Sequence, residues 1–239
     1  MKVSEVMTKE VASVSEETTL KVALDIMLRM NMRRLLVRNG KLTGILTIRD
    51  IVYNGDLNKK VGDVASKDVQ FVMPTATLKE ACRIMTSQAL GSLLVGDGVE
   101  VEGIVTERDL IRYCKPPSSN VGDVMNIDPI IAGKDATIKE IVDFMKKKWV
   151  RHAVIVEDSL PVGIISVRDI SRAMLSKGSL EVKVEGFMTV SPFKVTPDST
   201  LETARRIMVE HNIGFLPVVD PRTLLGSLSE REMIAAMSL

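Results

Sequence analysis

The segment Thr19-Leu20-Lys21-Val22-Ala23 recurs, with small changes, at Thr77, Thr137 and Thr200. In every copy apolar residues follow at offsets that trace one face of a helix. These residues are Ala23, Ile26 and Met27; Ala81, Ile84 and Met85; Ile141, Phe144 and Met145; and Ala204, Ile207 and Met208. The threonine ahead of each run is a predicted N-cap, and Glu80 and Glu140 complete capping boxes. The sequence therefore predicts four equivalent helices, with the repeated methionine of each in the core.

Two short strands are predicted after each of these helices. The first strands are Leu35-Leu36-Val37, Leu93-Leu94-Val95, Ala153-Val154-Ile155-Val156 and Leu216-Pro217-Val218-Val219. Turns such as Asn39-Gly40 and Asp97-Gly98 favour tight hairpins. The second strands contain Gly44, Gly103, Gly163 and Gly226, about 60 residues apart, as expected of an internal repeat.

A second helix is predicted to begin directly after each hairpin, at Ile48, Glu107, Val167 and Glu230. A further strand precedes the first helix, as at residues 11–14 and 193–195. The pattern predicts an α/β (α+β) fold of four β-α-β-β-α repeats.

A repeat of about 60 residues buries only about 60% of its surface, so the repeats are expected to pack together. The segment 115–120, Lys-Pro-Pro-Ser-Ser-Asn, is the most loop-like stretch and lies near the midpoint of the chain. We therefore predict two domains. Residues 1–115 hold repeats of about 1–57 and 58–115, and residues 118–239 hold repeats of about 118–178 and 179–239.

Composition limits the classes of function. The 239 residues are 45% hydrophobic, which excludes wholesale disorder, and the net charge of +1 gives no bulk electrostatic case for binding nucleic acid or a membrane surface. No apolar stretch reaches the roughly 18–20 residues of a membrane span. Cys82 and Cys114 fit no metal-ligand spacing and no disulfide framework. A reducing cytoplasm is expected, with both cysteines acting as small buried hydrophobes.

The motif with the clearest chemistry opens each second helix and has the form hydroxyl-x-Arg-acid. Its copies are Thr47-Ile48-Arg49-Asp50, Thr106-Glu107-Arg108-Asp109, Ser166-Val167-Arg168-Asp169 and Ser229-Glu230-Arg231-Glu232. A helix N-terminus attracts anions such as phosphate, the hydroxyl adds a donor, and the carboxylate can accept both hydrogens of a ribose diol. The alternative is a capping box that only starts the helix.

Two details of the motif favour a nucleotide site over a plain cap. Three copies carry Asp instead of the usual Glu, and all four carry an Arg, whose alternative role is an ion pair on the helix face. The fourth copy departs from the others, because the longer Glu232 is expected to intrude on the diol position.

Cations that suit phosphate stand before the first strand in alternate repeats. The first repeat has Arg33 and Arg34, and the third has Arg151 and His152, where the second and fourth have Gly91-Ser92 and Gly214-Phe215. Arginine binds phosphate with paired, charge-assisted hydrogen bonds. The alternative is ordinary solvated surface charge.

The repeats resemble the CBS domain, the family named after cystathionine β-synthase. The resemblance rests on the lead-ins of residues 3–7 and 121–125, on the Gly-containing strand and on the closing (Ser/Thr)-x-x-Asp. It implies that two repeats pair into a Bateman module and that two modules form a disc, which four repeats build within one chain. It also implies adenine in the cleft between paired repeats, with the ribose held by Asp50, Asp109 or Asp169. Phosphates would meet Thr47, Thr106 or Ser166 together with Arg33, Arg34 or Arg151.

The expected function is a regulatory sensor of AMP, ADP or ATP that transmits occupancy to a protein partner. The candidate ligand-binding residues are Thr47, Arg49, Asp50, Thr106, Arg108, Asp109, Ser166, Arg168, Asp169, Arg33, Arg34, Arg151 and His152. No catalytic residues, metal, membrane or nucleic-acid partner are expected, and the chain is expected to be a monomeric disc or a homodimer. One alternative is a scaffold with empty sites whose disc surface binds another protein or a nucleic acid, and another is a sensor of S-adenosylmethionine. Whether Mg²⁺ accompanies the ligand is open.

Overall fold

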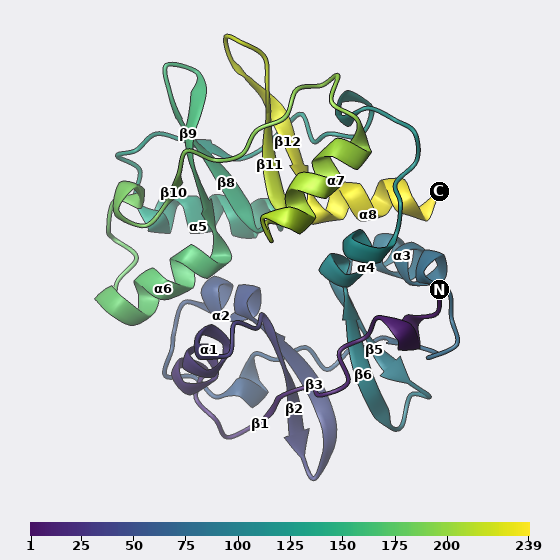
Figure 1. Ribbon diagram of the computed structural model, residues 1–239. Helices are drawn as coiled ribbons and strands as arrows, with labels where there is room; N and C mark the ends of the chain where they lie inside the picture. Colours follow the sequence, from purple (N-terminus) through teal and green to yellow (C-terminus); the bar gives the residue numbers. More distant parts are fainter. The chain divides into compact units, whose positions relative to one another are not determined.

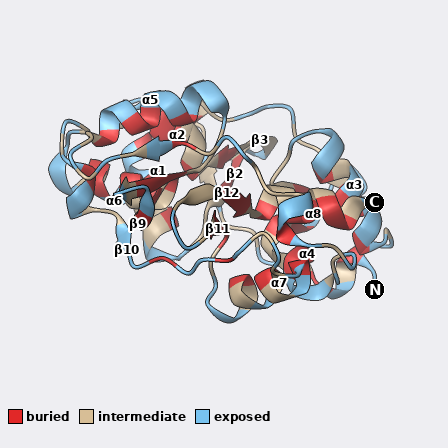
Figure 2. Cartoon of the chain, turned by 90° about the horizontal axis from the view of Figure 1, so that it is seen from above, coloured by how far each residue is buried: buried red, intermediate tan, exposed pale blue.

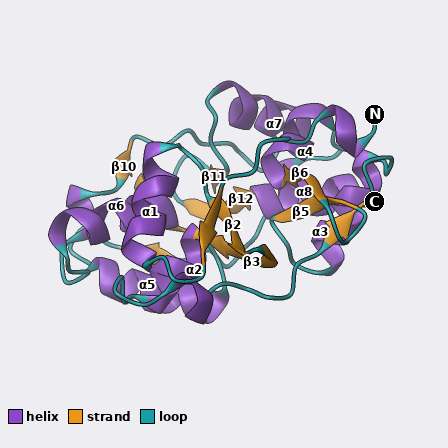
Figure 3. Ribbon diagram, turned by 90° about the horizontal axis from the view of Figure 1, so that it is seen from below, coloured by secondary structure: helices purple, strands orange, loops and turns teal.

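The computed structural model describes residues 1–239, which form helices and four small β-sheets (Figures 1 and 3). The helices are α1 (Leu20–Arg29), α2 (Ile48–Asn54), α3 (Leu78–Ser87), α4 (Glu107–Tyr113), α5 (Ile138–Lys148), α6 (Val167–Lys177), α7 (Leu201–Glu210) and α8 (Glu230–Ser238). The strands are β1 (Ser13–Ser15), β2 (Arg34–Asn39), β3 (Lys41–Thr47), β4 (Phe71–Val72), β5 (Ser92–Gly96), β6 (Val101–Thr106), β7 (Ile131–Ala132), β8 (His152–Glu157), β9 (Leu160–Ser166), β10 (Thr189–Val190), β11 (Phe215–Val219) and β12 (Leu224–Ser229).

The predicted β-α-β-β-α order is confirmed in the first three repeats, and every second helix begins at its predicted residue. The prediction of a first strand in the fourth repeat is wrong, because residues 193–195 form only a single β-bridge, between Val195 and Val218. The cause is Pro217. In the other repeats the amide at this position donates to the first strand, as Leu36 does to the carbonyl of Ala12 at 2.9 Å. Proline has no amide hydrogen, so this bond cannot form.

The predicted N-caps of the first helices are confirmed. The hydroxyl oxygens of Thr19, Thr77, Thr137 and Thr200 each accept a hydrogen bond from the amide three residues on. Glu80 and Glu140 accept from the amide of their own threonine at 2.6 and 2.8 Å, which completes both predicted capping boxes.

We expect the Glu140→Ala variant to lose more stability relative to the wild type at neutral pH than at pH 3. Hydrogen bonds from the Thr137 amide and hydroxyl lower the pKa of Glu140 below its usual 4.5. A carboxyl with a lowered pKa stabilises the folded state above its unfolded pKa, and this contribution is lost as the pH falls through the folded pKa. Urea unfolding of both proteins at pH 7 and pH 3 measures the difference, and an equal difference at the two pH values would contradict the assignment.

Two compact units make up the chain, and each gathers non-consecutive segments. Unit 1 contains Met1–Glu10, Gln70–Pro129 and Pro192–Leu239, and unit 2 contains Val11–Val69 and Ile130–Ser191. Unit 1 thus holds the helices and hairpins of repeats two and four, and unit 2 holds those of repeats one and three. The division of the chain into residues 1–115 and 118–239 stays a prediction.

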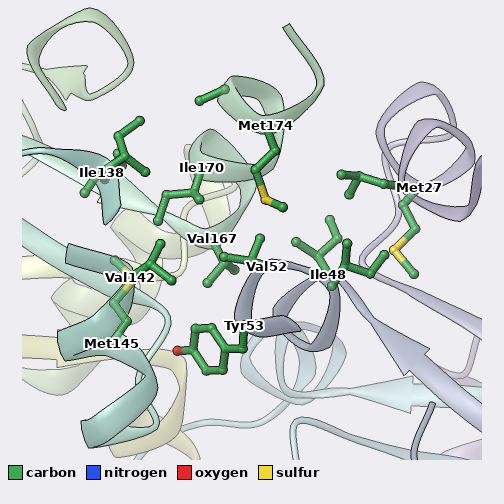
Figure 4. Close-up of a cluster of buried hydrophobic side chains, with 14 of the residues drawn as sticks. Met27, Ile48, Val52, Tyr53, Ile138, Val142, Met145, Val167, Ile170 and Met174 are labelled. Carbon is green, nitrogen blue, oxygen red and sulfur yellow. The ribbon is translucent and has the colours of Figure 1, made fainter. Parts of the chain in front are cut away.

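Each unit has its own apolar core, formed where the helices of its two repeats meet. In unit 2, α2 packs against α5 and α6, and Met27, Val52, Tyr53, Met145 and Met174 lie together in the core (Figure 4). The buried faces of the helices contrast with their exposed faces in Figure 2. The repeated methionines are buried as predicted: Met27, Met85, Met145 and Met208. Phe144 was predicted on the same face, but its side chain is 58% exposed.

The lead-ins do not pack on the repeats that they precede. Each lead-in contains a short 3-10 turn, and in all four the valine that begins this turn is fully buried. In the first lead-in, residues 3–8, the backbone of Thr8 forms hydrogen bonds with Ile104 of the second repeat. In the second lead-in, residues 61–66, the backbone of Ser66 forms hydrogen bonds with Ile45 of the first repeat. The third lead-in, which contains Asn126, pairs there with Ser227 of the fourth repeat. The fourth lead-in contains β10, which pairs with β9 of the third repeat. The chain therefore exchanges lead-ins between consecutive repeats.

This exchange explains the repeated glycine of each second strand. A Cβ atom on Gly44 would lie 2.6 Å from the carbonyl oxygen of Ser66, and one on Gly103 would lie 2.7 Å from that of Thr8. On Gly226 it would lie 2.5 Å from the carbonyl oxygen of Asn126. A side chain at these positions would displace the lead-in, so glycine is required where the two backbones meet.

Candidate functional site

The hydroxyl-x-Arg-acid motif forms a complete capping box in the first three repeats. In the first repeat the carboxylate of Asp50 accepts from the Thr47 amide at 2.8 Å and from the Thr47 hydroxyl at 2.7 Å. The Asp50 amide donates back to Thr47 Oγ1 at 3.3 Å. The same three bonds join Thr106 to Asp109 and Ser166 to Asp169. The shorter Asp therefore caps as well as Glu, and the inference that Asp argues against capping is wrong.

The fourth copy forms a modified box. Glu232 accepts from the Ser229 amide at 2.7 Å, so its longer side chain folds back as those of the three aspartates do. The Ser229 hydroxyl, however, accepts from the Arg231 amide at 3.2 Å in addition to the third helical amide. The start of α8 thus differs in its hydrogen bonding from α2, α4 and α6.

Capping occupies only part of each carboxylate. All the hydrogen bonds that the three Asp carboxylates accept within their capping boxes end on one oxygen, Oδ2. The other oxygen of Asp169, Oδ1, accepts from the guanidinium of Arg172 at 3.2 Å. A carboxylate has about four acceptor positions, so a capping role does not exclude a second hydrogen-bonding partner such as a diol.

The first amide of each second helix already has a partner. Ile48 N donates to Arg33 O and Val167 N donates to Arg151 O, both at 3.0 Å. With the third amide held by the motif hydroxyl, two of the first three amides are satisfied in α2 and α6. An anion at these helix ends would therefore depend on nearby cationic side chains and the helix dipole more than on a cradle of amides.

The strand-entry residues lie next to the motif hydroxyls. In the β2–β3 hairpin Arg34 is the cross-strand partner of Thr47, and in the β8–β9 hairpin His152 is the partner of Ser166. Directly opposed residues of an antiparallel pair have Cβ atoms about 4.5–5.5 Å apart. The other two repeats place Ser92 opposite Thr106 and Phe215 opposite Ser229. The structure therefore brings a basic residue and a motif hydroxyl together in repeats one and three alone.

Three of the four motif arginines, Arg49, Arg108 and Arg168, contact the facing repeat of their own unit. The Arg49 guanidinium stacks 4.1 Å from the Trp149 ring, and Arg168 donates to the side chain of Asn31. In unit 1 Arg108 donates to Asn212 Oδ1 at 2.9 Å. All three partners follow a first helix and have a positive φ, of 54°, 55° and 53° for Asn31, Trp149 and Asn212. The motif arginine therefore joins facing repeats, a role that the sequence did not suggest.

The first residue of the second helix differs between the units. In unit 1 it is Glu107 or Glu230, with 3% and 2% of the residue exposed, whereas in unit 2 it is Ile48 or Val167. The Arg108 Nε atom lies 3.0 Å from Glu230 Oε1, an ion pair within unit 1. Gly214 makes room for this side chain, because a Cβ there would lie 2.6 Å from the Glu230 carboxyl carbon. Sequence reasoning missed both buried acids, since nothing local marks a first-turn Glu as buried.

A shallow pocket adjoins this ion pair in unit 1. It holds about 240 Å³, including space open to solvent, and Arg108, Asn212 and Glu230 contribute its polar edge. No group of three or more His, Cys, Asp or Glu residues in the chain is arranged to hold a metal ion. No helix combines the length and the apolar character needed to cross a membrane.

The chain is similar to several proteins over its full length. A family model described as the CBS domain matches residues 3–55, 61–116, 121–176 and 184–239. The uncharacterized protein MJ1225 of Methanocaldococcus jannaschii is 25% identical, with 95% of each chain covered. Its crystal structure, described as that of a candidate archaeal homologue of g-AMPK, has a TM-score of 0.88 at 24% identity and covers 98% of this chain and 99% of that chain.

Two further similarities bear on the fold and on the repeats. An uncharacterized conserved protein from Pyrococcus horikoshii has a TM-score of 0.71 at 21% identity, over 99% of this chain and 100% of that chain. Inosine-5'-monophosphate dehydrogenase of Methanocaldococcus jannaschii is 32% identical over 52% of this chain, but over only 25% of its own length. The four family-model matches follow the four repeats and together span nearly the whole sequence. The chain therefore belongs to the CBS-domain family, with four copies of the domain.

Proposed function

We propose that the protein is a regulatory sensor that binds an adenine nucleotide, AMP, ADP or ATP, at the motifs of its CBS repeats. The observation that carries this proposal is the pairing of Arg34 with Thr47 and of His152 with Ser166 across their hairpins. Each pair sets a basic side chain beside a hydroxyl, with Asp50 or Asp169 bound to that hydroxyl. A phosphate suits the first two groups and a ribose diol suits the third.

Repeats one and three are the proposed phosphate-binding repeats. Arg33 and Arg151 directly precede the paired residues in the chain, and we propose that their charge adds to the attraction for phosphate. Repeat two offers Thr106 and Asp109 without a basic residue, and we propose that it contributes ribose contacts. Repeat four is the weakest candidate, because buried Phe215 stands opposite Ser229.

Arg49, Arg108 and Arg168 remain in the proposed binding set as residues that link a site to the facing repeat. Since each already contacts that repeat, a ligand drawing on the same guanidinium would change the contact between repeats. A coupling of about 1–3 kcal/mol is enough to change affinity for a protein partner several-fold to a hundred-fold. This is the route by which we propose that occupancy is transmitted to a partner.

A thermal-shift series with AMP, ADP, ATP and S-adenosylmethionine tests the proposal. A ligand at about 100 times its Kd adds about 2.7 kcal/mol to the stability of the folded state, which for a chain of this size raises Tm by roughly 5–10 °C. We expect this rise with at least one nucleotide. We expect none with S-adenosylmethionine, whose sulfonium cation would lie beside the cationic Arg33, Arg34 or Arg151. No shift with any of the four compounds would overturn the proposal in favour of a scaffold with empty sites.

Asp50→Ala and Asp169→Ala should each remove part of the nucleotide-induced shift. Both variants also lose a capping box, so the basal Tm falls and only the shift caused by ligand is informative. Glu80→Ala and Glu140→Ala are matched controls, because each removes a capping acid of the same geometry from a first helix, outside the motif. If the controls lose as much of the shift as the Asp variants, the motif is a cap alone.

A further inference from the structure

The two cysteines of the chain, which the sequence treated as unrelated, lie together in unit 1. Cys82 is in the middle of α3 and 1% exposed, and Cys114 directly follows α4 and is half-buried. Cys114 packs against the same apolar core that contains Cys82, and α3, which contains Cys82, packs against α4, which Cys114 follows. The two thiols shift each other's pKa through a hydrogen bond. The expectation that both are simple buried hydrophobes is therefore wrong for Cys114, which is partly open to solvent.

The surroundings of the two thiols make them chemically unequal. The hydrogen bond to Cys114, reinforced by burial, raises the pKa of Cys82 and keeps it protonated. The same hydrogen bond lowers the pKa of Cys114, and the positive charge of Arg205 acts in the same direction. Arg205 is held there by hydrogen bonds to the carbonyls of Ile111 and Arg112, at 3.1 and 3.3 Å. Since thiolates are the reactive form, Cys114 is the nucleophile of the pair.

We propose that Cys82 and Cys114 are a reversible modification site, which forms an intramolecular disulfide by exchange with a small-molecule disulfide. The Cys114 thiolate attacks one sulfur of the reagent, a mixed disulfide forms and one thiolate leaves. Cys82 then loses its proton and attacks the Cys114 sulfur, which expels the second reagent thiolate. The protein loses two protons and two electrons, and the reagent gains them and is reduced to two thiols.

The disulfide would tie α3 to the end of α4. The loop that it closes, residues 82–114, contains the β5–β6 hairpin and the motif residues Thr106, Arg108 and Asp109. Residue 114 also directly precedes the linker of residues 115–120 that leads to the third repeat. Oxidation would therefore fix both α4 and the start of this linker to the core of unit 1.

The test treats the full-length folded protein with glutathione disulfide. We expect a mass decrease of about 2 Da, from the loss of two hydrogens, and a peptide linking Cys82 to Cys114 after digestion without reductant. Closing a loop of this length should raise Tm by roughly 5–10 °C, reversibly on addition of dithiothreitol. A folded protein that keeps both thiols, or that forms the disulfide only in urea, overturns the proposal.

Single-cysteine variants test the order of attack. In Cys82→Ala we expect glutathione to remain attached to Cys114, because no second thiol is present to resolve the mixed disulfide. In Cys114→Ala the buried Cys82 should remain unmodified in the folded state. Cys82→Val serves if the alanine variant is not folded by circular dichroism. Equal labelling of the two single-cysteine proteins overturns the assignment of Cys114 as the nucleophile.

Discussion

Arg108→Leu should lower the free energy of unfolding by about 3 kcal/mol, because it removes the ion pair that Arg108 forms with the buried carboxylate of Glu230. Breaking a buried pair by removing one member typically costs about 3–5 kcal/mol, and the lower end applies because the Arg108 side chain is 27% exposed. The variant also loses the bond to Asn212. Urea unfolding followed by far-UV circular dichroism measures the loss.

Arg49→Leu is the matched control, since it changes the same motif position in unit 2. There Val167 takes the place of Glu230, and Arg49 stacks on the Trp149 ring. A cation–π contact at a partly exposed site contributes about 1 kcal/mol, so this variant should be affected less. Trp149 is the single tryptophan of the chain, and its fluorescence reports the change in unit 2 directly.

A second substitution separates the effect of charge from the loss of packing. In Arg108→Leu/Glu230→Gln the buried group keeps its shape and loses its charge, so we expect more than half of the lost stability to return. A double variant as unstable as Arg108→Leu alone would mean that the cost arises from packing around the arginine stem. Equal losses for Arg108→Leu and Arg49→Leu would contradict the importance assigned to the buried carboxylate.

The parts of the fold that were predictable from the sequence are those set by local rules. Thr77 and Thr137 cap their helices because a hydroxyl and a Glu at this spacing satisfy amides of the same turn. The starts of the second helices were predictable for the same reason. Pro217 shows where the repeat misled, since equal spacing predicted a strand that one missing amide hydrogen prevents.

The contacts that the sequence did not reveal join residues far apart in the chain. Arg49 meets Trp149 and Arg168 meets Asn31 because repeats one and three pack together in unit 2. A periodic pattern shows which face of a helix is apolar, but not which repeat covers that face. One signal in the sequence was missed. Asn is favoured in the left-handed region of positive φ, and Asn31 and Asn212 both follow a predicted first helix, so the left-handed residues there were predictable.

The sequence predicted which residue types make up the candidate site, but it predicted less well how these residues are placed relative to one another. Thr47 and Asp50 were placed correctly at a helix start, and the hairpin register adds that Arg34 stands opposite Thr47. The sequence also suggested amides free to bind an anion, whereas Arg33 already accepts the first amide of α2. A hydrogen bond from the first amide of a helix to the residue before a strand depends on the orientation of the hairpin relative to the helix. Composition and spacing do not specify this orientation.

Gly226→Val should lower the free energy of unfolding by about 2–4 kcal/mol by displacing the third lead-in from the β11–β12 hairpin. The new Cβ would stand 2.5 Å from the carbonyl oxygen of Asn126, a backbone atom that cannot move without its segment. Displacement breaks the two bonds between Asn126 and Ser227, of 2.8 and 2.9 Å. It also exposes Val121, which is fully buried. Two hydrogen bonds at about 1 kcal/mol each and one exposed valine account for the expected loss.

Limited proteolysis distinguishes this local displacement from a general loss of stability. A lead-in released from its sheet should be cut within residues 115–126 at protease concentrations that leave the wild type intact, because cleavage requires a segment to detach from the fold. Gly133→Ala is the matched control: a Cβ there meets no atom within 4 Å, so stability and cleavage should stay unchanged or improve slightly. If Gly226→Val is cut no faster than Gly133→Ala, the lack of a side chain at Gly226 is not what allows the third lead-in to pack on the β11–β12 hairpin. The repeated glycines would then need another explanation.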